Sequence, residues 1–540
     1  MKRIFIYSLS IVMVILSSCE DVIEVDNRSF STAEEFYLTE EGFESLVNAN
    51  YASLKGIYGG SNSLFSMGTD MYAEGSGRSA EPLGLSQYTE LNPSSGGVNQ
   101  IYNSAYRAIR QANTALYYAD LTEPAATIST RIGEVKYLRA NAYFLLVQTY
   151  GGVPIITDLI DTPVIEVDRD SAEAVYTLIL ADLNDALASV GSGAYDGRVT
   201  QRAVQHLLAK VHLTKGNESF GSASDFSSAA SFADQAISGQ GLGLSFAEVW
   251  ESGNEDNEEV LFSVRYSAGA ASSNPTGLGN QQALFYGPYM GGNEVAGDAP
   301  RRSYTLLATD FALRLFTPDD ARYEVTFMTQ VFDRYFDFYD EDDHSGLGIA
   351  EFYEPYWFTP ADSTAYVNSA NLSTDFDYHI YETTYAQIVS GDWETIPAKK
   401  FDDPSAPFGT SSSTKDIIHS RLGDTYLLAA EAYLSAGDAA TGLARLNIVR
   451  ARAGVVDATL GEFDIDYILD ERGRELFGEY HRFFDLKRTG KLVERASLHH
   501  PLIEESNFNG ASGLKILRPI PQSALDLNQN KDFPQNPAYN

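Results

Sequence analysis

The chain has 540 residues, of which 38 are lysine or arginine and 74 are aspartate or glutamate, so its formal net charge is −36. A surface this acidic repels phosphate backbones, which argues against nucleic acid as a partner. Hydrophobic residues make up 44% of the chain, enough material for a large folded core, and this excludes an intrinsically disordered protein.

The N-terminus has the features of a bacterial secretory signal. Lys2 and Arg3 precede a mostly apolar run, residues 4–16, which is too short to span a bilayer. The run leads into Leu-Ser-Ser-Cys, which fits the lipobox of bacterial lipoproteins, and Cys19 is the only cysteine of the chain. We predict a signal peptide over residues 1–18, a lipid anchor at Cys19, and an acidic tether over residues 19–30.

The next part of the chain has the apolar periodicity of paired amphipathic helices. A first helix is predicted to begin after Thr39, its N-cap, and to end at Gly59-Gly60. Five more are predicted before residue 240, and these cover Gln100–Tyr118, Ile132–Thr149, Ala172–Ala188 (capped by Ser171), Gln201–Lys215 and Asp225–Ile237.

A last pair of helices is predicted around a turn at Gly437-Asp438, with apolar stripes from Leu422 to Tyr433 and from Leu443 to Val449. Alanines at the crossings and a glycine-containing turn are typical of tetratricopeptide units of about 34 residues. Such pairs cannot bury their apolar faces alone and must stack into one scaffold. On the pattern alone, unrelated helical hairpins are the alternative.

Residues 242–407 differ in composition, being rich in loops and holding all 3 tryptophans of the chain. Short β-like runs are predicted at Val260–Tyr266 and Tyr323–Gln330. Because loops on a rigid scaffold commonly carry binding sites, this insert is the first place to look for one.

A glycan site needs exposed aromatic rings for the apolar faces of sugars, framed by polar side chains for their hydroxyl groups. In the insert the best matches are Tyr289, Tyr356, Trp357 and Trp393. The loop after the first predicted helix adds a second group, Asp70, Tyr72 and Arg78. We expect Trp357 and Tyr356 to contact a sugar from one side, with Asp70 or Tyr72 facing them. For any single aromatic, burial in the core is the competing interpretation.

Searches for catalytic and metal-binding motifs find little. The sequence has no HExxH, GxSxG, P-loop or complete GxGxxG motif, so we expect no enzyme, metal or cofactor. Tyr339–Ala350 is acidic but lacks the spacing of an EF-hand loop, which favours a solvated acidic turn. The sequence leaves open whether two carboxylates are placed for glycoside hydrolysis, because the distance between them depends on the three-dimensional fold.

The segment Glu471–Gly490, ERGRELFGEYHRFFDLKRTG, has the most informative pattern. Read as one helix, it buries a stripe formed by Leu476, Tyr480, Phe483 and Phe484. The opposite face pairs charges three residues apart, which we interpret as a solvated, structural face. Two glycines inside a helix indicate close contact with another backbone. The expected pairs are Glu471 with Arg474, Glu479 with Arg482, and Asp485 with Arg488, and the glycines are Gly473 and Gly478.

This segment resembles the C-terminal hallmark of the RagB/SusD family, the outer-membrane nutrient-binding lipoproteins of Bacteroidetes. Two further family motifs follow it in the family's order, Leu517–Pro521 (LRPIP) and Asn536–Tyr539 (NPAY, with Ala538 in place of a glycine). Tyr137–Ile156 and Arg421–Asp438 also look like family blocks. The resemblance therefore extends over nearly all of the chain after the predicted signal.

The resemblance implies a mainly α SusD-like fold, with four tetratricopeptide-like helix pairs as scaffold and a large loop-rich, partly β region. It implies an N-terminal helical region over residues 31–240 and a C-terminal RagB/SusD region over residues 241–540. The acidic stretch after Cys19 resembles the export tag that sends such lipoproteins to the cell surface, although a solvated linker reads the same way.

The resemblance implies that the protein is a surface lipoprotein of the outer membrane. Its implied function is to capture an oligo- or polysaccharide and deliver it to a SusC-like TonB-dependent transporter. Two alternatives stay open. One is a RagB-type protein that binds peptides for uptake, and the other is a surface glycoside hydrolase.

Overall fold

The computed structural model describes residues 33–60, 63–74, 83–267, 279–286, 306–383, 386, 395–405 and 412–540. Within these ranges the long helices pack as four pairs. The pairs are α3 (Glu40–Tyr58) with α6 (Val98–Ala119), α7 (Ile128–Tyr150) with α8 (Ala172–Ser189), α9 (Gln201–Gly216) with α10 (Ala223–Ile237), and α19 (Leu422–Ser435) with α20 (Ala439–Arg452).

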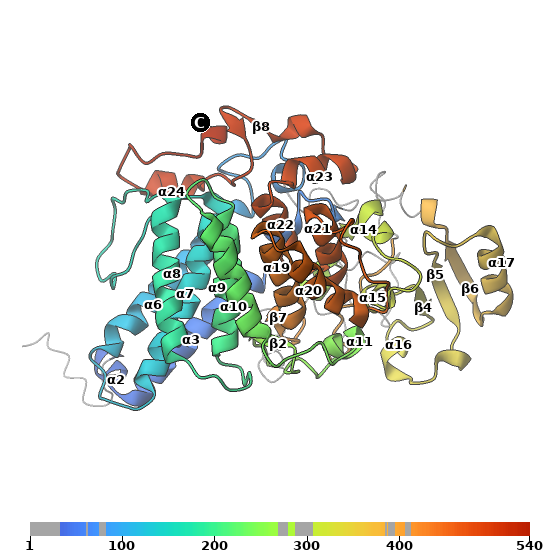
Figure 1. Ribbon diagram of the computed structural model, residues 1–540, viewed down its shortest axis with the longest axis horizontal. Helices are drawn as coiled ribbons and strands as arrows, with labels where there is room; N and C mark the ends of the chain where they lie inside the picture. The colour runs from blue at the N-terminus through green and yellow to red at the C-terminus, as the bar shows by residue number, and fades with distance from the viewer. Residues whose placement is uncertain are drawn as a thin grey trace, which may run out of the picture.

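The four pairs form one continuous stack. Helix α6 packs on α7, α8 on α9, and α10 on α19, so each pair covers the apolar face of the next. The chain leaves the stack after α10 and returns to it at α19. Figure 1 shows the stack at the left and centre, with the chain between α10 and α19 extending to the right. The predicted scaffold of four helix pairs is confirmed.

Local chemistry sets the ends of these helices. Thr39 accepts a hydrogen bond from the Gly42 amide at 3.1 Å, and Ser171 accepts one from the Ala174 amide at 3.2 Å. Both side chains satisfy amides that have no partner within the first helical turn. Gly437, between α19 and α20, has φ of 89°, a backbone conformation that favours glycine.

Short strands connect the stack to the rest of the molecule. Strand β2 pairs antiparallel with β7, β1 with β3, and β8 with β9, while β4, β5 and β6 form a three-stranded sheet in which β5 and β6 are parallel. The bounds are β1 Tyr72–Ala73, β2 Val260–Val264, β3 Leu307–Ala308, β4 Gln330–Phe332, β5 Ile349–Tyr353, β6 Leu372–His379, β7 Ile417–Arg421, β8 Asn509–Gly510 and β9 Gly513–Leu514.

Shorter helices fill the insert and the C-terminal part. Those of the first part of the chain and the insert are α2 Ala33–Tyr37, α4 Ser63–Ser66, α5 Leu83–Gln87, α11 Phe246–Trp250, α13 Gln282–Tyr286, α14 Asp310–Arg314, α15 Arg322–Thr326, α16 Asp337–Asp340, η2 His344–Gly346 and α17 Pro360–Ser369. After the stack come α21 Ile465–Glu475, α22 Arg482–Arg488, α23 Leu492–His499, η3 Glu505–Phe508, α24 Gln522–Leu527 and η4 Pro537–Tyr539.

One prediction for the insert is wrong in detail. The first half of the β-like run Tyr323–Gln330 is the helical turn α15, and strand β4 begins only at its last residue. The neighbouring Arg322 is fully buried and paired with Asp320, Glu471 and Glu475, which holds this turn in place. Trp250, one of the 3 tryptophans of the insert, ends α11 in the core, with 9% of its surface exposed.

In the described part of the chain, no helix combines the length and the apolar character needed to cross a bilayer.

Candidate functional site

The segment Glu471–Gly490 is a helix–turn–helix and not the single helix that its pattern predicts. Helix α21 ends at Glu475 and α22 begins at Arg482. Between them, Gly478 and Tyr480 have φ of 77° and 68°. A Cβ at Gly478 would lie 2.3 Å from the Phe401 ring, and the Gly478 amide donates a hydrogen bond to the Tyr72 hydroxyl at 2.7 Å. The close contacts at this glycine are therefore with side chains and not with another backbone as expected, and Gly478 lies in a turn and not inside a helix.

The predicted burial of the four apolar side chains is confirmed, but they lie on the turn and on α22 and not along one helix. Leu476, Tyr480, Phe483 and Phe484 are all buried. The Tyr480 ring stacks on that of Phe65 with 5.0 Å between centroids, and this contact connects the C-terminal motif to the short helix α4.

The charged side chains of the segment are buried, so the prediction of a solvated face is wrong. Two of the three expected pairs form, with Arg474 2.7 Å from Glu471 and Arg488 3.0 Å from Asp485. The third expected pair, Glu479 with Arg482, does not form. Arg482 instead binds Asp70, and Glu479 binds Lys400 and Arg421. Cations from distant parts of the chain enclose these carboxylates, and spacing along one helix cannot reveal them.

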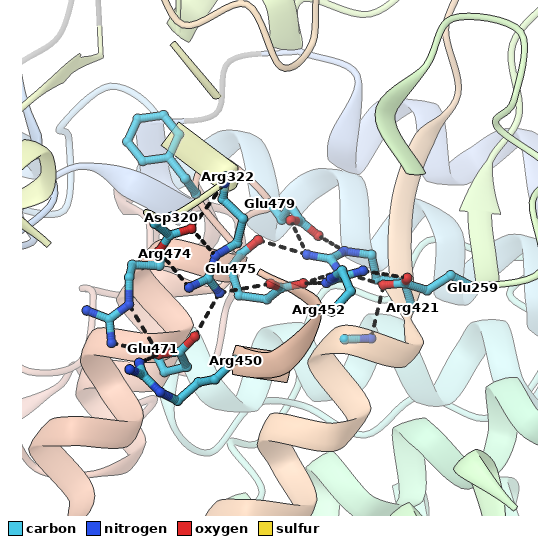
Figure 2. Close-up of polar contacts among 12 residues, drawn as sticks. Glu259, Asp320, Arg322, Arg421, Arg450, Arg452, Glu471, Arg474, Glu475 and Glu479 are labelled. Carbon is cyan, nitrogen blue, oxygen red and sulfur yellow. Dashed lines mark hydrogen bonds and ion pairs between the residues drawn. The ribbon is translucent and has the colours of Figure 1, made fainter. Parts of the chain in front are cut away.

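Figure 2 shows the centre of this network. Arg421 contacts Glu475 at 2.6 Å, Glu479 at 2.7 Å and Glu259 at 2.8 Å, with every one of these side chains at most 2% exposed. Arg452 and Arg322 also contact Glu475. The network therefore joins the insert, strand β7, helix α20 and helix α21.

The electrostatics of the network oppose proton transfer. Burial alone would raise the pKa of Glu471, but Arg474, Arg322 and Arg450 outweigh it and lower the pKa to about 2. The surrounding arginines lower the pKa of Glu475 as well. A general acid must hold a proton near neutral pH, and these carboxylates do not. The C-terminal network therefore serves the fold.

Two of the predicted site residues belong to this core. Asp70 is fully buried, and its carboxylate accepts hydrogen bonds from Arg482 at 2.7 Å and Arg495 at 3.0 Å. Tyr72 is 3% exposed and its ring lies 5.1 Å from that of Phe477. Neither side chain is open to a ligand, so the expectation that they face Trp357 across a sugar is wrong. Their polar atoms are needed to satisfy buried partners, which the local sequence does not show.

Four predicted residues lie outside the described residues: Cys19, Arg78, Tyr289 and Trp393.

Tyr356 and Trp357 lie together on the insert, as their adjacency in the sequence predicts. Both are half-buried, and their rings meet edge to face at 5.1 Å. The Tyr356 hydroxyl donates to the Phe316 carbonyl at 2.8 Å, and the Trp357 ring packs on Tyr323 at 4.8 Å. These contacts fix the two rings without enclosing them.

Arg314, which no sequence motif points to, completes this surface. The guanidinium of Arg314 lies over the rings of Tyr356 and Tyr381, at 5.2 Å and 5.0 Å from their centroids. Its side chain is 48% exposed. The only signal in the sequence is the pair formed with Asp310, one helical turn earlier. We call Arg314, Tyr356 and Trp357 the aromatic ledge. Tyr381 is only 4% exposed and supports the Arg314 guanidinium from the core.

The aromatic ledge has the chemistry of a binding surface. Half-exposed rings offer apolar faces, and a guanidinium offers several hydrogen-bond donors at their edge. Among the described residues, no group of three or more histidine, cysteine, aspartate or glutamate side chains is arranged to hold a metal ion.

Two family models match the chain. The model described as "SusD family" covers residues 258–539, and the model described as "Starch-binding associating with outer membrane" covers residues 26–213. Among curated proteins, SusD-like protein P25 of Formosa agariphila is 26% identical over 515 residues, which are 88% of each chain. A SusD-like protein of Bacteroides ovatus is 24% identical over 416 residues, 74% of this chain and 66% of that one.

Solved structures share the fold. A laminarin-binding SusD-like protein superposes with a TM-score of 0.69 at 24% identity, covering 93% of this chain and all of the other. Surface glycan-binding protein A from Bacteroides thetaiotaomicron, solved with laminarihexaose, has a TM-score of 0.69 at 18% identity, covering 92% of this chain and all of the other. With four stacked helix pairs, a loop-rich insert and a family model matching more than half of its length, the chain belongs to the SusD family.

Proposed function

We propose that this protein is a surface lipoprotein of the outer membrane that captures oligo- or polysaccharides and passes them to a SusC-like TonB-dependent transporter. Membership of the SusD family carries the proposal. Two proteins that share its fold are named for glycan binding, one for laminarin and one solved with laminarihexaose.

In this proposal the protein binds without catalysing a reaction. The aromatic ledge offers stacking and hydrogen bonding on one open face, which suits a ligand that must later be released. The buried carboxylates of the C-terminal network stay ionised and enclosed, and this supports a structural role for them.

Calorimetry of the protein without its lipid anchor tests whether it binds a glycan, and which one. Laminarin and starch are the first two ligands to titrate, followed by a panel of other polysaccharides and of peptides. We expect saturable binding to at least one polysaccharide. Binding to peptides alone would replace the proposal with the RagB-type alternative, and release of reducing ends from a bound polysaccharide would show hydrolysis.

Fractionation of cells tests the anchor. Replacing Cys19 with alanine should move the protein from the outer membrane to soluble fractions, because lipid chains on this residue are the proposed attachment. A Cys19→Ala variant that stays on the outer membrane would contradict the lipoprotein assignment.

Purification from the native membrane tests the partner. A tagged chain extracted in mild detergent should bring with it a large TonB-dependent transporter in fixed ratio. If the tagged chain binds glycan but no such transporter accompanies it, the delivery step is wrong and the capture step stands.

A further inference from the structure

An open groove lies on the first two helix pairs, away from the aromatic ledge. Its volume is about 620 Å³, and its walls are α6, the segment 154–167 and the α24 region. Figure 1 shows α24 next to the helices at the left of the molecule. Along its rim, Val164, Ile165 and Leu527 are 54%, 52% and 79% exposed. We call this feature the α6–α24 groove.

Exposed apolar side chains that cluster along one groove are typical of a binding site. Isolated exposed apolar residues are ordinary on protein surfaces, but a contiguous set beside a cavity commonly marks a binding site. Ile109, Ile156 and Ile160 extend the apolar lining of the same groove.

Two arginines on α6 give the groove a positive edge. Arg107 and Arg110 line it, are exposed, and lie one helical turn apart. Among the arginines of the described residues, only these two guanidinium groups have neither a hydrogen bond nor an ion pair. Asp158, Asp161 and Glu166 on the facing segment form no ion pair with them. In a chain with a net charge of −36, two available arginines at an apolar groove favour an acidic partner with apolar side chains.

The chain itself contains a segment of this chemistry. Residues 20–26 read Glu-Asp-Val-Ile-Glu-Val-Asp. In an extended conformation Ile23 and Val25 project to one side, while Glu24 and Asp26 project to the other. The apolar side matches the lining of the groove, and the carboxylates match Arg107 and Arg110.

The described chain begins near one end of the groove. Tyr37, at the end of α2, has its ring 5.2 Å from that of Tyr118, and the Thr122 hydroxyl donates to the Tyr37 carbonyl at 3.2 Å. Both contacts place α2 at the C-terminal end of α6. Asn113, the groove residue nearest that end, lies about 8 Å along the helix from Tyr118.

The lengths agree as well. Along α6 the groove extends from Asn113 to Asn99, about 21 Å at the rise of a helix. Seven extended residues cover about 23 Å, so residues 20–26 match the groove in length. The six residues 27–32 can bridge up to about 20 Å between the groove and Ala33.

We propose that residues 20–26 bind in the α6–α24 groove, with their carboxylates paired to Arg107 and Arg110. The acidic segment after Cys19 is then an intramolecular ligand of the scaffold. Its binding would hold the first helix pairs at a fixed distance from the lipid anchor. This proposal does not depend on which ligand the protein captures.

Photocrosslinking of the mature chain tests the contact. With Val25 replaced by p-benzoylphenylalanine, and Cys19→Ser to remove the lipid, irradiation joins position 25 to whatever lies beside it. Peptide mass spectrometry should place the crosslink on groove residues such as Ile160 or Leu527. The yield should not change when the protein is diluted, because both partners belong to one chain.

Charge reversal separates this binding from chance contact. The variant carrying Arg107→Glu and Arg110→Glu should lower the crosslink yield at least about fivefold, because two attractive pairs become repulsive. The control carries Arg314→Glu and Arg334→Glu, at side chains 48% and 54% exposed on the insert, and should keep the yield. If the groove variant melts early, high salt screens the same pairs in the unchanged chain and should also lower the yield.

Several outcomes would overturn the proposal. Crosslinks outside the groove, or none at all, would show that residues 20–26 do not bind there. Crosslinks between two chains would assign the groove to a second copy. A groove crosslink that neither charge reversal nor salt reduces would remove the role of Arg107 and Arg110.

Discussion

The C-terminal network and the aromatic ledge use the same kinds of side chain for opposite purposes. In the network, Arg322 and Arg421 are fully buried, and several carboxylates surround each of them. In the ledge, Arg314 keeps 48% of its side chain exposed and lies across two rings. An arginine among carboxylates and aromatic rings can therefore be assigned to stability or to ligand binding only once the exposed fraction of its side chain is known.

Two bidentate arginine–carboxylate pairs test this dependence on burial. Arg488 binds Glu431 at 2.9 and 2.7 Å with both side chains at most 1% exposed, and Arg445 binds Asp234 at 3.0 Å with both side chains 29% exposed. Arg488→Ala should cost roughly 3–5 kcal/mol, because it leaves Glu431 buried without its partner. Arg445→Ala should cost about 1 kcal/mol or less.

Urea unfolding of both variants measures the difference. Equal costs would show that burial does not control the contribution of these pairs. The charge spacing predicts that the pair of Arg488 with Asp485 lies on a solvated face, and that prediction is wrong because both side chains are at most 2% exposed.

The apolar side of the same motif gives the second prediction. Phe484 is 6% exposed and meets Phe65 edge to face at 6.1 Å. Phe484→Ala should cost about 3–5 kcal/mol through lost burial and the cavity left behind. The control is Val456→Ala, at a position 83% exposed, which should change stability by about 0.5 kcal/mol or less. A Phe484→Ala cost as small as the control would show that the motif does not hold the stack together.

Buried histidines beside the network predict a loss of stability in acid. Burial lowers the pKa of His206 to about 4 and that of His419 to about 3, from an ordinary value of 6.5. Between pH 6.5 and 4 the unfolded chain therefore binds protons at these histidines that the folded chain does not bind. The contribution of these groups to stability is complete above pH 6.5 and falls as the pH drops toward 4.

His206 is the histidine whose replacement tests this prediction. Its ring contacts Thr425 at 2.8 Å and lies near Asp424 and Lys210. His206→Gln removes the titrating group, so the slope of unfolding free energy against pH between neutral and about pH 4.5 should fall by up to about 1.4 kcal/mol per pH unit. The control is His344→Gln on the insert. An unchanged slope in His206→Gln would contradict the role of this histidine.

The smallest expected effect concerns the ledge. Trp357→Ala should weaken binding of a captured polysaccharide by roughly 1–3 kcal/mol, the cost of losing one stacked aromatic contact. Folding should change little, because the ring is only half-buried. Trp250→Ala is the matched control, since Trp250 is 9% exposed and packs on Phe401 at 5.4 Å. It should lower the melting temperature and leave the affinity of the folded protein unchanged.

Calorimetry and thermal melting of the two tryptophan variants separate the roles. If Trp357→Ala binds normally, the ledge is not the glycan surface. If it melts as early as Trp250→Ala, the ledge belongs to the core.

Local patterns in the sequence are enough to predict the helical scaffold and its family. The caps at Thr39 and Ser171 and the turn at Gly437 act between residues a few positions apart, so they can be recognised without the fold. The same holds for the apolar stripe from Leu476 to Phe484, whose burial follows from periodicity.

Which charged and aromatic side chains are enclosed depends on the folded chain as a whole. The sequence around Asp70 is that of a ligand-binding carboxylate, yet arginines more than 400 residues away bind it. No sequence motif points to Arg314, yet it completes the ledge beside Tyr356, which lies more than 40 residues later. Burial and ion pairing depend on groups brought together from distant parts of the chain, and one segment's spacing does not contain that information.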